Sequence, residues 1–193
     1  MPLFDSSDHP QSMRAYLQAL DEDDWLRVIE SPAAAEYEVA AYLALAGTGP
    51  ALVFANVPGH TMRVVGNLLP SRERIALGLS TAPNALQKKL VDAIRAPLRG
   101  RRADRAPCQQ VAVERPDLDT LPIPRFFEHE TGPYLTAGAI VARNPDTGGA
   151  NLSYARLKPL GGNRAMIGIA PNHHLAVFAR SARRARGRGC RSP

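Results

Sequence analysis

The sequence predicts an α+β protein, in which an N-terminal α/β domain is followed by the beginning of an antiparallel β-barrel domain. Helix-like and strand-like patterns alternate along residues 1–107, which is typical of an α/β domain. Residues 108–182 instead contain strand-like runs separated by turn sequences such as NPDTGG and GGN. Because three or four strands rarely close a barrel, we expect the second domain to be incomplete.

In the N-terminal half, apolar residues recur at helical spacing over residues 11–20 and predict a helix there. Ser31 and Pro32 supply an N-cap and a first-turn proline for a helix over residues 33–45. Further helices are expected from Ser71 and over residues 84–98, and strands over residues 25–30, 51–57 and 62–69. A polar connector, GRRADRAP at 100–107, marks the expected domain boundary.

The second half is expected to consist mainly of strands. The strand-like runs are CQQVAVE at 108–114, YLTAGAIVA at 134–142, ANLSYARLKPL at 150–160 and RAMIGIA at 164–170. The sequence GGN at 161–163 is suited to a tight turn, so we expect residues 152–159 and 164–170 to form a hairpin. A helix is expected to begin after His174.

The predicted hairpin brings Asn151 and His174 together, although they lie far apart in the sequence. An amide oxygen and an imidazole nitrogen suit a divalent cation such as Mn²⁺. Two neutral ligands leave the charge of the ion unbalanced, so an acidic ligand or a phosphate must complete the site. The free N–H groups of a helix beginning near Leu175 favour a phosphate. The pattern therefore predicts a phosphate-bearing cofactor that is held through a metal.

Arg156 does not fit this pattern directly. Side chains alternate between the faces of a strand, so Asn151, Ser153 and Ala155 share one face and Arg156 lies on the other. Either a bulge or twist turns Arg156 toward the site, or the arginine has another role.

Simpler interpretations stand beside these hypotheses. An isolated Asn-x-Ser sequence usually has no function, and a histidine pair at a helix start is more often a cap or a surface feature. The Glu128-His129-Glu130 cluster is better explained as a polar patch on an edge strand than as an acid–base pair. The GTG sequence at 47–49 lacks the third glycine of a dinucleotide-binding fingerprint.

The charge distribution argues against nucleic-acid binding. The net charge is +6, but the six arginines of residues 180–193 account for all of it. Removing them from the 24 basic residues leaves 18, which equals the 18 acidic residues. A nucleic-acid surface would normally place its basic residues on a folded face. Binding through the arginine-rich tail remains an alternative, and it predicts an affinity that falls steeply with salt.

The cellular location is expected to be the cytoplasm. No apolar run approaches the roughly 18 residues of a membrane span, so no membrane association is expected. The N-terminus lacks the basic and apolar regions of a secretory signal. Cys108 and Cys190 are too few for a disulfide framework, and neither lies in a C-x-x-C motif.

The segment TLPIPRFFEHETGPYLTAG, together with NLSYARLKPLGG and MIGIAPNHH, resembles the UbiD family of reversible decarboxylases. The resemblance is strong over residues 116–182 and weaker over the N-terminal half. It implies a split β-barrel of the FMN-binding type and decarboxylation of an unsaturated or aromatic carboxylic acid through a prenylated FMN adduct. It also implies a cofactor phosphate bound through Mn²⁺ and K⁺, and a UbiX-type flavin prenyltransferase as the supplier of the cofactor.

The resemblance assigns roles to individual residues. The family motif Asn-x-Ser-x-x-Arg falls on Asn151, Ser153 and Arg156. Asn151 and His174 would be the metal ligands, and Arg156 would be catalytic, as the arginine of a Glu-Arg-Glu network that handles the substrate carboxylate. The residues implied to contact the cofactor are Asn151, Leu152, Ser153, Tyr154, Ala155, Arg156, His173 and His174.

The chain also departs from the family pattern. Family chains are more than twice as long, and their acidic metal ligand, both network glutamates and a cofactor-contacting lysine lie beyond the end of this sequence. Residues 183–193 do not follow the family and are expected to be a disordered or out-of-frame tail. We therefore expect a truncated chain, whose full-length form would be a homo-oligomer. The alternative is a catalytically inactive fragment with at most weak cofactor and metal binding.

Overall fold

The computed structural model describes residues 12–98, residue 104 and residues 109–188. The chain divides into two compact units between Glu114 and Arg115. The expected connector at 100–107 lies outside the described residues except for Asp104. The predicted domain boundary after residue 107 therefore stays a prediction.

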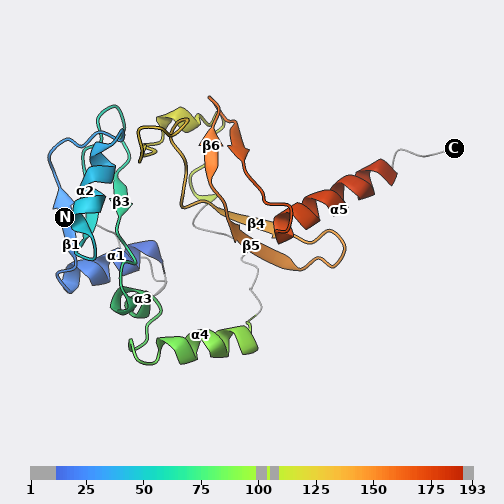
Figure 1. The fold of residues 1–193 in the computed structure, drawn as a ribbon, viewed down its shortest axis with the longest axis horizontal. Helices are drawn as coiled ribbons and strands as arrows, with labels where there is room; N and C mark the ends of the chain where they lie inside the picture. Colours follow the sequence, from blue (N-terminus) through green and yellow to red (C-terminus); the bar gives the residue numbers. More distant parts are fainter. Residues whose placement is uncertain (1–11, 99–103, 105–108, 189–193) are drawn as a thin grey trace. The chain divides into compact units, whose positions relative to one another are not determined.

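Unit 1 is built on a three-stranded mixed sheet with the order β1-β2-β3 (Figure 1). The strands are β1 Leu26–Ile29, β2 Ala51–Phe54 and β3 Val64–Gly66. The central strand β2 pairs in parallel with β1 and antiparallel with β3. All four residues of β2 are buried, as the continuous apolar run ALVF predicts for a strand covered on both faces.

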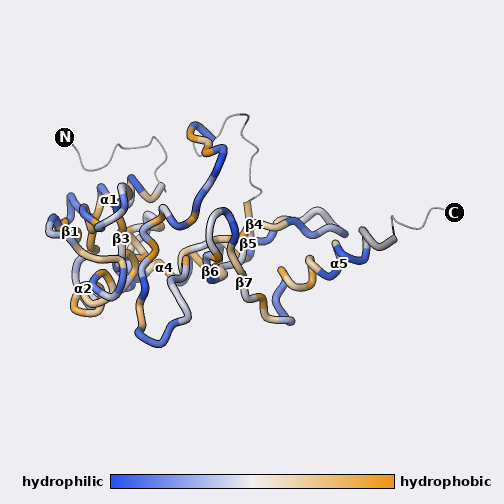
Figure 2. The backbone as a smooth tube through the Cα atoms, turned by 90° about the horizontal axis from the view of Figure 1, so that it is seen from above, coloured by the Kyte–Doolittle hydropathy of each residue, from blue (hydrophilic) through white to orange (hydrophobic). Residues whose placement is uncertain are grey.

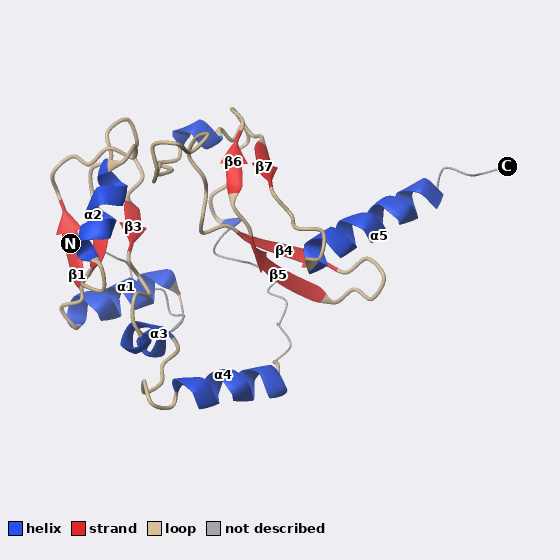
Figure 3. Cartoon of the chain, viewed as in Figure 1, coloured by secondary structure: helices blue, strands red, loops and turns tan. Residues whose placement is uncertain are grey.

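The alternating side chains of β2 supply two hydrophobic clusters. Val53 packs with Leu17 and Leu20 of helix α1, Met13–Glu22. Leu52 and Phe54 pack in the second cluster, with Val39 of helix α2, Glu38–Ala46. Successive residues of a strand point to opposite faces, so α1 and α2 cover opposite sides of the sheet. Two further helices, α3 Arg72–Gly78 and α4 Leu86–Arg95, follow β3 (Figure 3).

Helix α2 begins later than the sequence predicts. Ser31 and Pro32 do not start a helix, because the backbone N–H of Ala33 donates to the carbonyl oxygen of Asn56 at 3.0 Å. Ala33 is fully buried, and this contact holds the chain against the segment after β2. The helix begins only after Tyr37, whose φ of 68° breaks the preceding turn. By contrast, Ser71 caps α3 as predicted, since its side chain accepts from the N–H of Arg74 at 3.3 Å.

Unit 2 contains two separate antiparallel ladders. The strands are β4 Ala139–Arg143, β5 Ala150–Tyr154, β6 Leu157–Pro159 and β7 Ala165–Ile167. β4 pairs with β5, and β6 pairs with β7. A short 3-10 helix, η2 Leu118–Thr120, precedes them. Within the part of the chain that the structure describes, these ladders do not join into a barrel.

Several predicted strands differ from the structure; the run at 134–142, for example, is a strand only from Ala139. The predicted strand at 150–160 is divided, since β5 ends at Tyr154 and β6 starts at Leu157. The predicted hairpin is therefore confirmed only near its tip, where β6 pairs with β7 across the turn at 161–163. Residues 109–114 form no strand. Val111 and Val113 are 82% and 67% exposed, so this run has no packing partner that would fix it as a strand.

The last element is helix α5, His174–Arg188, which packs against β4 and β5. Its apolar residues lie in its first turns and polar residues follow (Figure 2). Disorder was expected over residues 183–193. The helix extends through residues 183–188, because alanine and arginine are both favourable helix formers, and residues 189–193 lie outside the described part of the chain. None of the described helices is both long and apolar enough to cross a membrane.

Candidate functional site

Asn151 of β5 and His174 of α5 meet at the centre of the candidate site. The Nδ1 atom of His174 lies 3.2 Å from Oδ1 of Asn151. The amide nitrogen of Asn151 donates to Oγ of Ser153 at 2.7 Å, which leaves the amide oxygen directed at the imidazole. The predicted meeting of Asn151 and His174 is therefore confirmed. The route differs, because β5 pairs with β4 and the packing of α5 on these strands brings His174 to Asn151.

The Asn151–His174 pair is suited to hold a cation. An amide oxygen only accepts hydrogen bonds, so this contact is a hydrogen bond when Nδ1 of His174 carries the proton. A cation between the two atoms would require the other tautomer, with the proton on Nε2. The separation of 3.2 Å is close to the about 3 Å expected between neighbouring ligands of an octahedral ion with bonds of about 2.1 Å.

This pair cannot complete a metal site by itself. Among the described residues, no group of three or more histidine, cysteine, aspartate or glutamate side chains could hold a metal ion. An ion at Asn151 and His174 would therefore need further oxygen ligands from a phosphate, from water or from an acidic group. This agrees with the sequence argument that two neutral ligands leave the charge unbalanced.

The two adjacent histidines have different environments. The ring of His174 is stacked on Phe178, one turn further along α5, with centroids 6.4 Å apart and an interplanar angle of 13°. The carbonyl oxygen of His173 accepts from the N–H groups of Ala176 and Val177, so its backbone forms the start of α5. Both histidines are exposed. The contacts with Phe178 and Asn151 direct the ring of His174, and the cofactor contact expected of His173 stays a prediction.

The break between β5 and β6 resolves the problem posed by Arg156. The N–H of Ala155 donates to the carbonyl oxygen of Gly138 at 3.2 Å, and Leu157 exchanges backbone hydrogen bonds with Leu135 at 2.9 and 3.1 Å. Arg156 lies between these two anchored positions and belongs to no strand, so strand alternation does not fix its direction. Its guanidinium carbon lies 5.8 Å from the centre of the Tyr134 ring, a cation–π arrangement.

Arg156 also lines a cavity of about 460 Å³ in unit 2. Tyr134 is held beside it, since its hydroxyl lies 3.0 Å from Oγ1 of Thr131. The carboxylate of Glu130 accepts from the N–H groups of Phe126 and Phe127 at 3.1 and 3.4 Å. This glutamate therefore organises a turn instead of a strand edge. The lining residues are His129, Glu130, Thr131, Tyr134, Arg156, Met166 and Gly168.

Leu152 and Tyr154 were also expected to contact the cofactor, and they do not share a face of β5 with Asn151. Leu152 and Tyr154 are 59% and 75% exposed, whereas the alternate residues Asn151 and Ser153 are half-buried. Leu152 and Tyr154 thus occupy the opposite face of β5. The structure brings Asn151, Ser153 and His174 together, and leaves the role of the opposite face untested.

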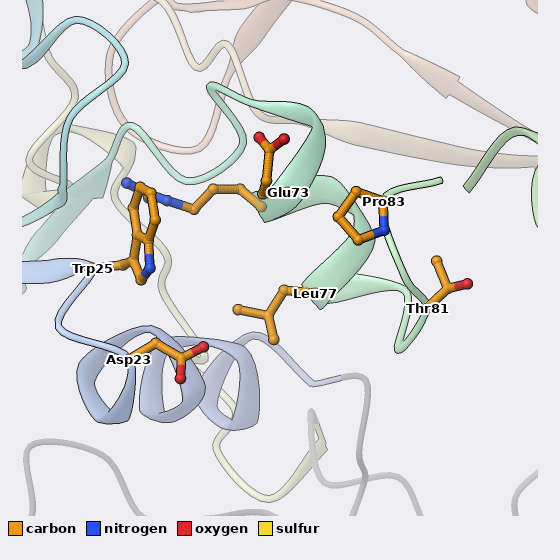
Figure 4. Close-up of a pocket in the computed structure, with 7 residues that line it drawn as sticks. Asp23, Trp25, Glu73, Leu77, Thr81 and Pro83 are labelled. Carbon is orange, nitrogen blue, oxygen red and sulfur yellow. The ribbon is translucent and has the colours of Figure 1, made fainter. Parts of the chain in front are cut away.

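A second cavity, of about 240 Å³, lies in unit 1 and was not predicted. Figure 4 shows Trp25 and Asp23 on one side of it and Leu77 on the other. Its wall contains Arg74, which is 2% exposed and whose guanidinium carbon lies 4.8 Å from the centre of the Trp25 ring. The signal in the sequence is that Arg74 lies three residues before Leu77, on the apolar side of α3. The full lining is Asp23, Trp25, Glu73, Arg74, Leu77, Thr81 and Pro83.

The guanidinium of Arg74 forms hydrogen bonds to the backbone of unit 1. It donates to the carbonyl oxygen of Asn67 at 3.1 Å and to that of Gly49. Burial lowers the pKa of Arg74, and the neighbouring Tyr16 opposes that shift. The guanidinium thus joins the segment just before β2 to the residue just after β3, and we assign it to the stability of unit 1.

Comparison with known protein families gives two matches along the chain. The model of the 3-octaprenyl-4-hydroxybenzoate carboxy-lyase N-terminal domain matches residues 17–94. The model of the 3-octaprenyl-4-hydroxybenzoate carboxy-lyase Rift-related domain matches residues 100–191. Together the two matches cover most of the chain, including Asn151, Arg156 and His174.

Individual relatives are longer than this chain. It is 30% identical to an anhydromevalonate phosphate decarboxylase of Methanothermobacter thermautotrophicus, over 89% of this chain and 40% of the relative. It is 35% identical to the enzyme of the same name from Aeropyrum pernix, over 91% of this chain and 38% of the relative. The chain thus spans about 40% of the length of these curated relatives.

Solved structures share the fold. An evolved dimeric form of the UbiD-class enzyme HmfF from Pelotomaculum thermopropionicum, in complex with prFMN, matches with a TM-score of 0.86 and 34% identity. The match covers 91% of this chain and 42% of that one. The apo 3,4-dihydroxybenzoic acid decarboxylase of Enterobacter cloacae matches with a TM-score of 0.80 and 24% identity, over 89% of this chain and 39% of that one. This second likeness shows the fold alone.

Proposed function

The chain belongs to the UbiD family, and from this premise we propose that it contributes to a reversible carboxy-lyase that uses prenylated FMN and acts on an unsaturated or aromatic carboxylic acid. The observation that carries the proposal is the 3.2 Å contact between Asn151 and His174. It joins, across 23 residues, the two positions that the family pattern assigns to a metal. The prFMN complex of HmfF supports the choice of cofactor.

Asn151 and His174 would hold Mn²⁺, with K⁺ beside it, and the cation would bind the cofactor phosphate. Ser153 would orient Asn151, since it accepts the amide N–H at 2.7 Å. The free N–H groups at the start of α5 would add donors for the same phosphate. Because Asn151 and His174 are neutral ligands, they cannot balance the charge of the cation. The negative charge of the phosphate would do so.

Arg156 would bind the carboxylate of the substrate. A guanidinium group forms two parallel hydrogen bonds to a carboxylate and so fixes its orientation. The ring of Tyr134 beside it, at 5.8 Å, would restrict the guanidinium to the side of the cavity. When bound, prenylated FMN would supply an electron sink for the electron pair left behind as CO₂ departs.

We also propose that strands β4 to β7 form part of a split barrel of the FMN-binding type. One face of the β4–β5 ladder carries Val141, Leu152 and Tyr154, which are 71%, 59% and 75% exposed. An apolar face of this kind normally packs against another element. We further propose that the protein forms a homo-oligomer in the cytoplasm. A UbiX-type flavin prenyltransferase would supply its cofactor.

Production together with a flavin prenyltransferase tests the proposal. We expect flavin to be retained only when Mn²⁺ is supplied, and CO₂ to be released from an unsaturated or aromatic acid. Substitution Arg156→Met should abolish CO₂ release and leave Mn²⁺ binding intact, because Arg156 is proposed to bind the substrate carboxylate and not the metal. Flavin retention without any turnover would favour the inactive-fragment alternative. Turnover unaffected by Arg156→Met would refute the role of the arginine.

A further inference from the structure

Gly168 lies in the wall of the cavity that Arg156 lines. It comes directly after β7, two positions beyond Met166, which lines the same cavity. Both residues line the cavity, so we expect a side chain at position 168 to take up space in it, near that of Met166.

Neither backbone conformation nor packing requires glycine at this position. The φ angle of Gly168 lies outside the left-handed region, and a Cβ atom added there would meet nothing within 4 Å. Gly138 in the same unit differs, because its Cβ would lie 2.6 Å from Cδ1 of Leu157. Gly161 and Gly162 have φ angles of 87° and 58°, which favour glycine. The fold would thus tolerate a side chain at position 168, and that side chain would reduce the volume of the cavity.

We propose that Gly168 is a specificity-determining residue, whose missing side chain leaves room beside Arg156 for the organic part of the acid. The proposal rests on the proposed function, in which Arg156 holds the carboxylate. The Tyr134 ring and the Met166 thioether form walls suited to a flat, conjugated or aromatic group. The cavity of about 460 Å³ lies within the roughly 300–1,000 Å³ range of small-molecule sites.

The test uses Gly168→Ala, Gly168→Val and Gly168→Leu with two probes, acrylate and cinnamate. The probes share a carboxylate and a conjugated double bond and differ by a phenyl ring. We expect calorimetry to show cinnamate binding weakened stepwise, by about tenfold or more for Gly168→Leu, with acrylate binding unchanged. The Tm should stay equal or rise for Gly168→Ala, because replacing an unstrained glycine reduces the entropy of the unfolded chain.

Gly149→Ala is the matched control. Its added Cβ would lie in ordinary contact, 3.5 Å from Oγ1 of Thr147, and Gly149 does not line the cavity. Gly149→Ala should therefore change the binding of neither acrylate nor cinnamate. The proposal would be overturned if the Gly168 variants weakened the binding of both probes equally, or if Gly168→Ala lowered the Tm. Either result would show a structural role for Gly168. Unchanged cinnamate binding, or no cinnamate binding to the wild-type chain, would overturn the proposal as well.

Arg156→Met separates this inference from the proposed function. The substitution should weaken the binding of acrylate and of cinnamate equally, since both probes bind through the carboxylate contact. If Arg156→Met leaves the binding of both probes unchanged, the role of the arginine in the proposed function is refuted. If Arg156→Met weakens both and the Gly168 variants do not discriminate between them, the inference about Gly168 alone fails.

Discussion

The imidazole Nδ1 of His174 lies 3.2 Å from the amide Oδ1 of Asn151, although 23 residues separate them. The two side chains reach each other from a strand and from the first residue of a helix packed on it. A neutral pair at this distance forms a hydrogen bond when the imidazole carries its proton on Nδ1, and two metal ligands when it does not. The same contact can therefore preorganise the site before a cation binds.

His174→Ala should abolish Mn²⁺ binding and, with it, flavin retention. The loss should exceed the roughly 10- to 100-fold that follows removal of an outer-shell partner, because a ligand itself is removed. Mn²⁺ titration followed by electron paramagnetic resonance measures the first effect, and flavin absorbance the second. His173→Ala is the control and should keep Mn²⁺, because Asn151 contacts the imidazole of His174 and His173 is not a proposed ligand. Wild-type amounts of both metal and flavin in His174→Ala would contradict the assignment.

Ser153→Ala should weaken Mn²⁺ binding by roughly 10- to 100-fold without unfolding the chain. The hydroxyl of Ser153 accepts the amide N–H of Asn151 at 2.7 Å, and without it the amide can rotate its oxygen away from His174. Ser153→Thr keeps the hydroxyl and should restore binding in the same titration. Ser181→Ala is the matched control, because it removes a hydroxyl that contacts Asp146 and not Asn151. Equal Mn²⁺ affinity in wild type and Ser153→Ala would show that Ser153 does not position the ligand.

The core of unit 1 could be predicted from the sequence because its pattern is local. Residues 51–54 are apolar without interruption, which indicates a strand buried on both faces, and β2 has this property. The start of α2 could not be predicted, since the hydrogen bond from Ala33 to Asn56 joins segments 23 positions apart. A favourable capping sequence at Ser31 and Pro32 was overridden by that contact.

The contact between Asn151 and His174 was predictable from the sequence, whereas the way in which the chain forms it was not. The sequence argument brought the two side chains together through one hairpin around the turn at 161–163, but β5 pairs with β4 and only β6 pairs with β7. The division of the strand after Tyr154 was not visible, because it depends on the pairing of Leu157 with Leu135, which no local pattern encodes. The contact of Arg74 with Trp25 was missed for the same reason.

Tyr16 should make the stability of unit 1 sensitive to alkaline pH. Its hydroxyl lies 2.8 and 3.0 Å from the carbonyl oxygens of Leu68 and Arg74. Burial raises the pKa of Tyr16, against the opposing effect of the Arg74 charge. The folded state therefore holds the proton more tightly, so this stabilisation is complete below about pH 10, the ordinary tyrosine pKa. It is lost as the pH rises through the raised pKa.

Urea denaturation at pH 8 and at pH 11 measures this effect. The free energy of unfolding should fall more steeply with pH in the wild type than in Tyr16→Phe, which has no hydroxyl to titrate at this position. Tyr154→Phe removes an exposed hydroxyl and should keep the wild-type slope. An equally steep fall in Tyr16→Phe would show that other groups cause the alkaline loss.

Arg74→Met should destabilise unit 1 by about 2–4 kcal/mol. The substitution keeps most of the side-chain volume and removes the guanidinium, which donates to the carbonyl oxygens of Gly49 and Asn67. The carbonyl oxygen of Gly49 would keep the amide of Asn67 as a donor, at 3.2 Å, whereas that of Asn67 would lose the guanidinium, and a carbonyl left unsatisfied away from water costs about 1–3 kcal/mol. Loss of the contact with the Trp25 ring, at 4.8 Å, adds to this cost.

An opposing effect is the desolvation of the Arg74 charge. Among the described residues no ion pair joins Arg74 to a carboxylate, and replacing a buried charge by an apolar side chain can stabilise a protein. We expect the lost hydrogen bonds to dominate, because the guanidinium bonds to two separate backbone segments. Urea denaturation followed by the fluorescence of Trp25, the single tryptophan of the chain, measures the balance. Arg14→Met, on the exposed side of α1, should change stability by less than about 0.5 kcal/mol. An Arg74→Met protein as stable as the wild type would show that desolvation of the cation offsets all of its contacts.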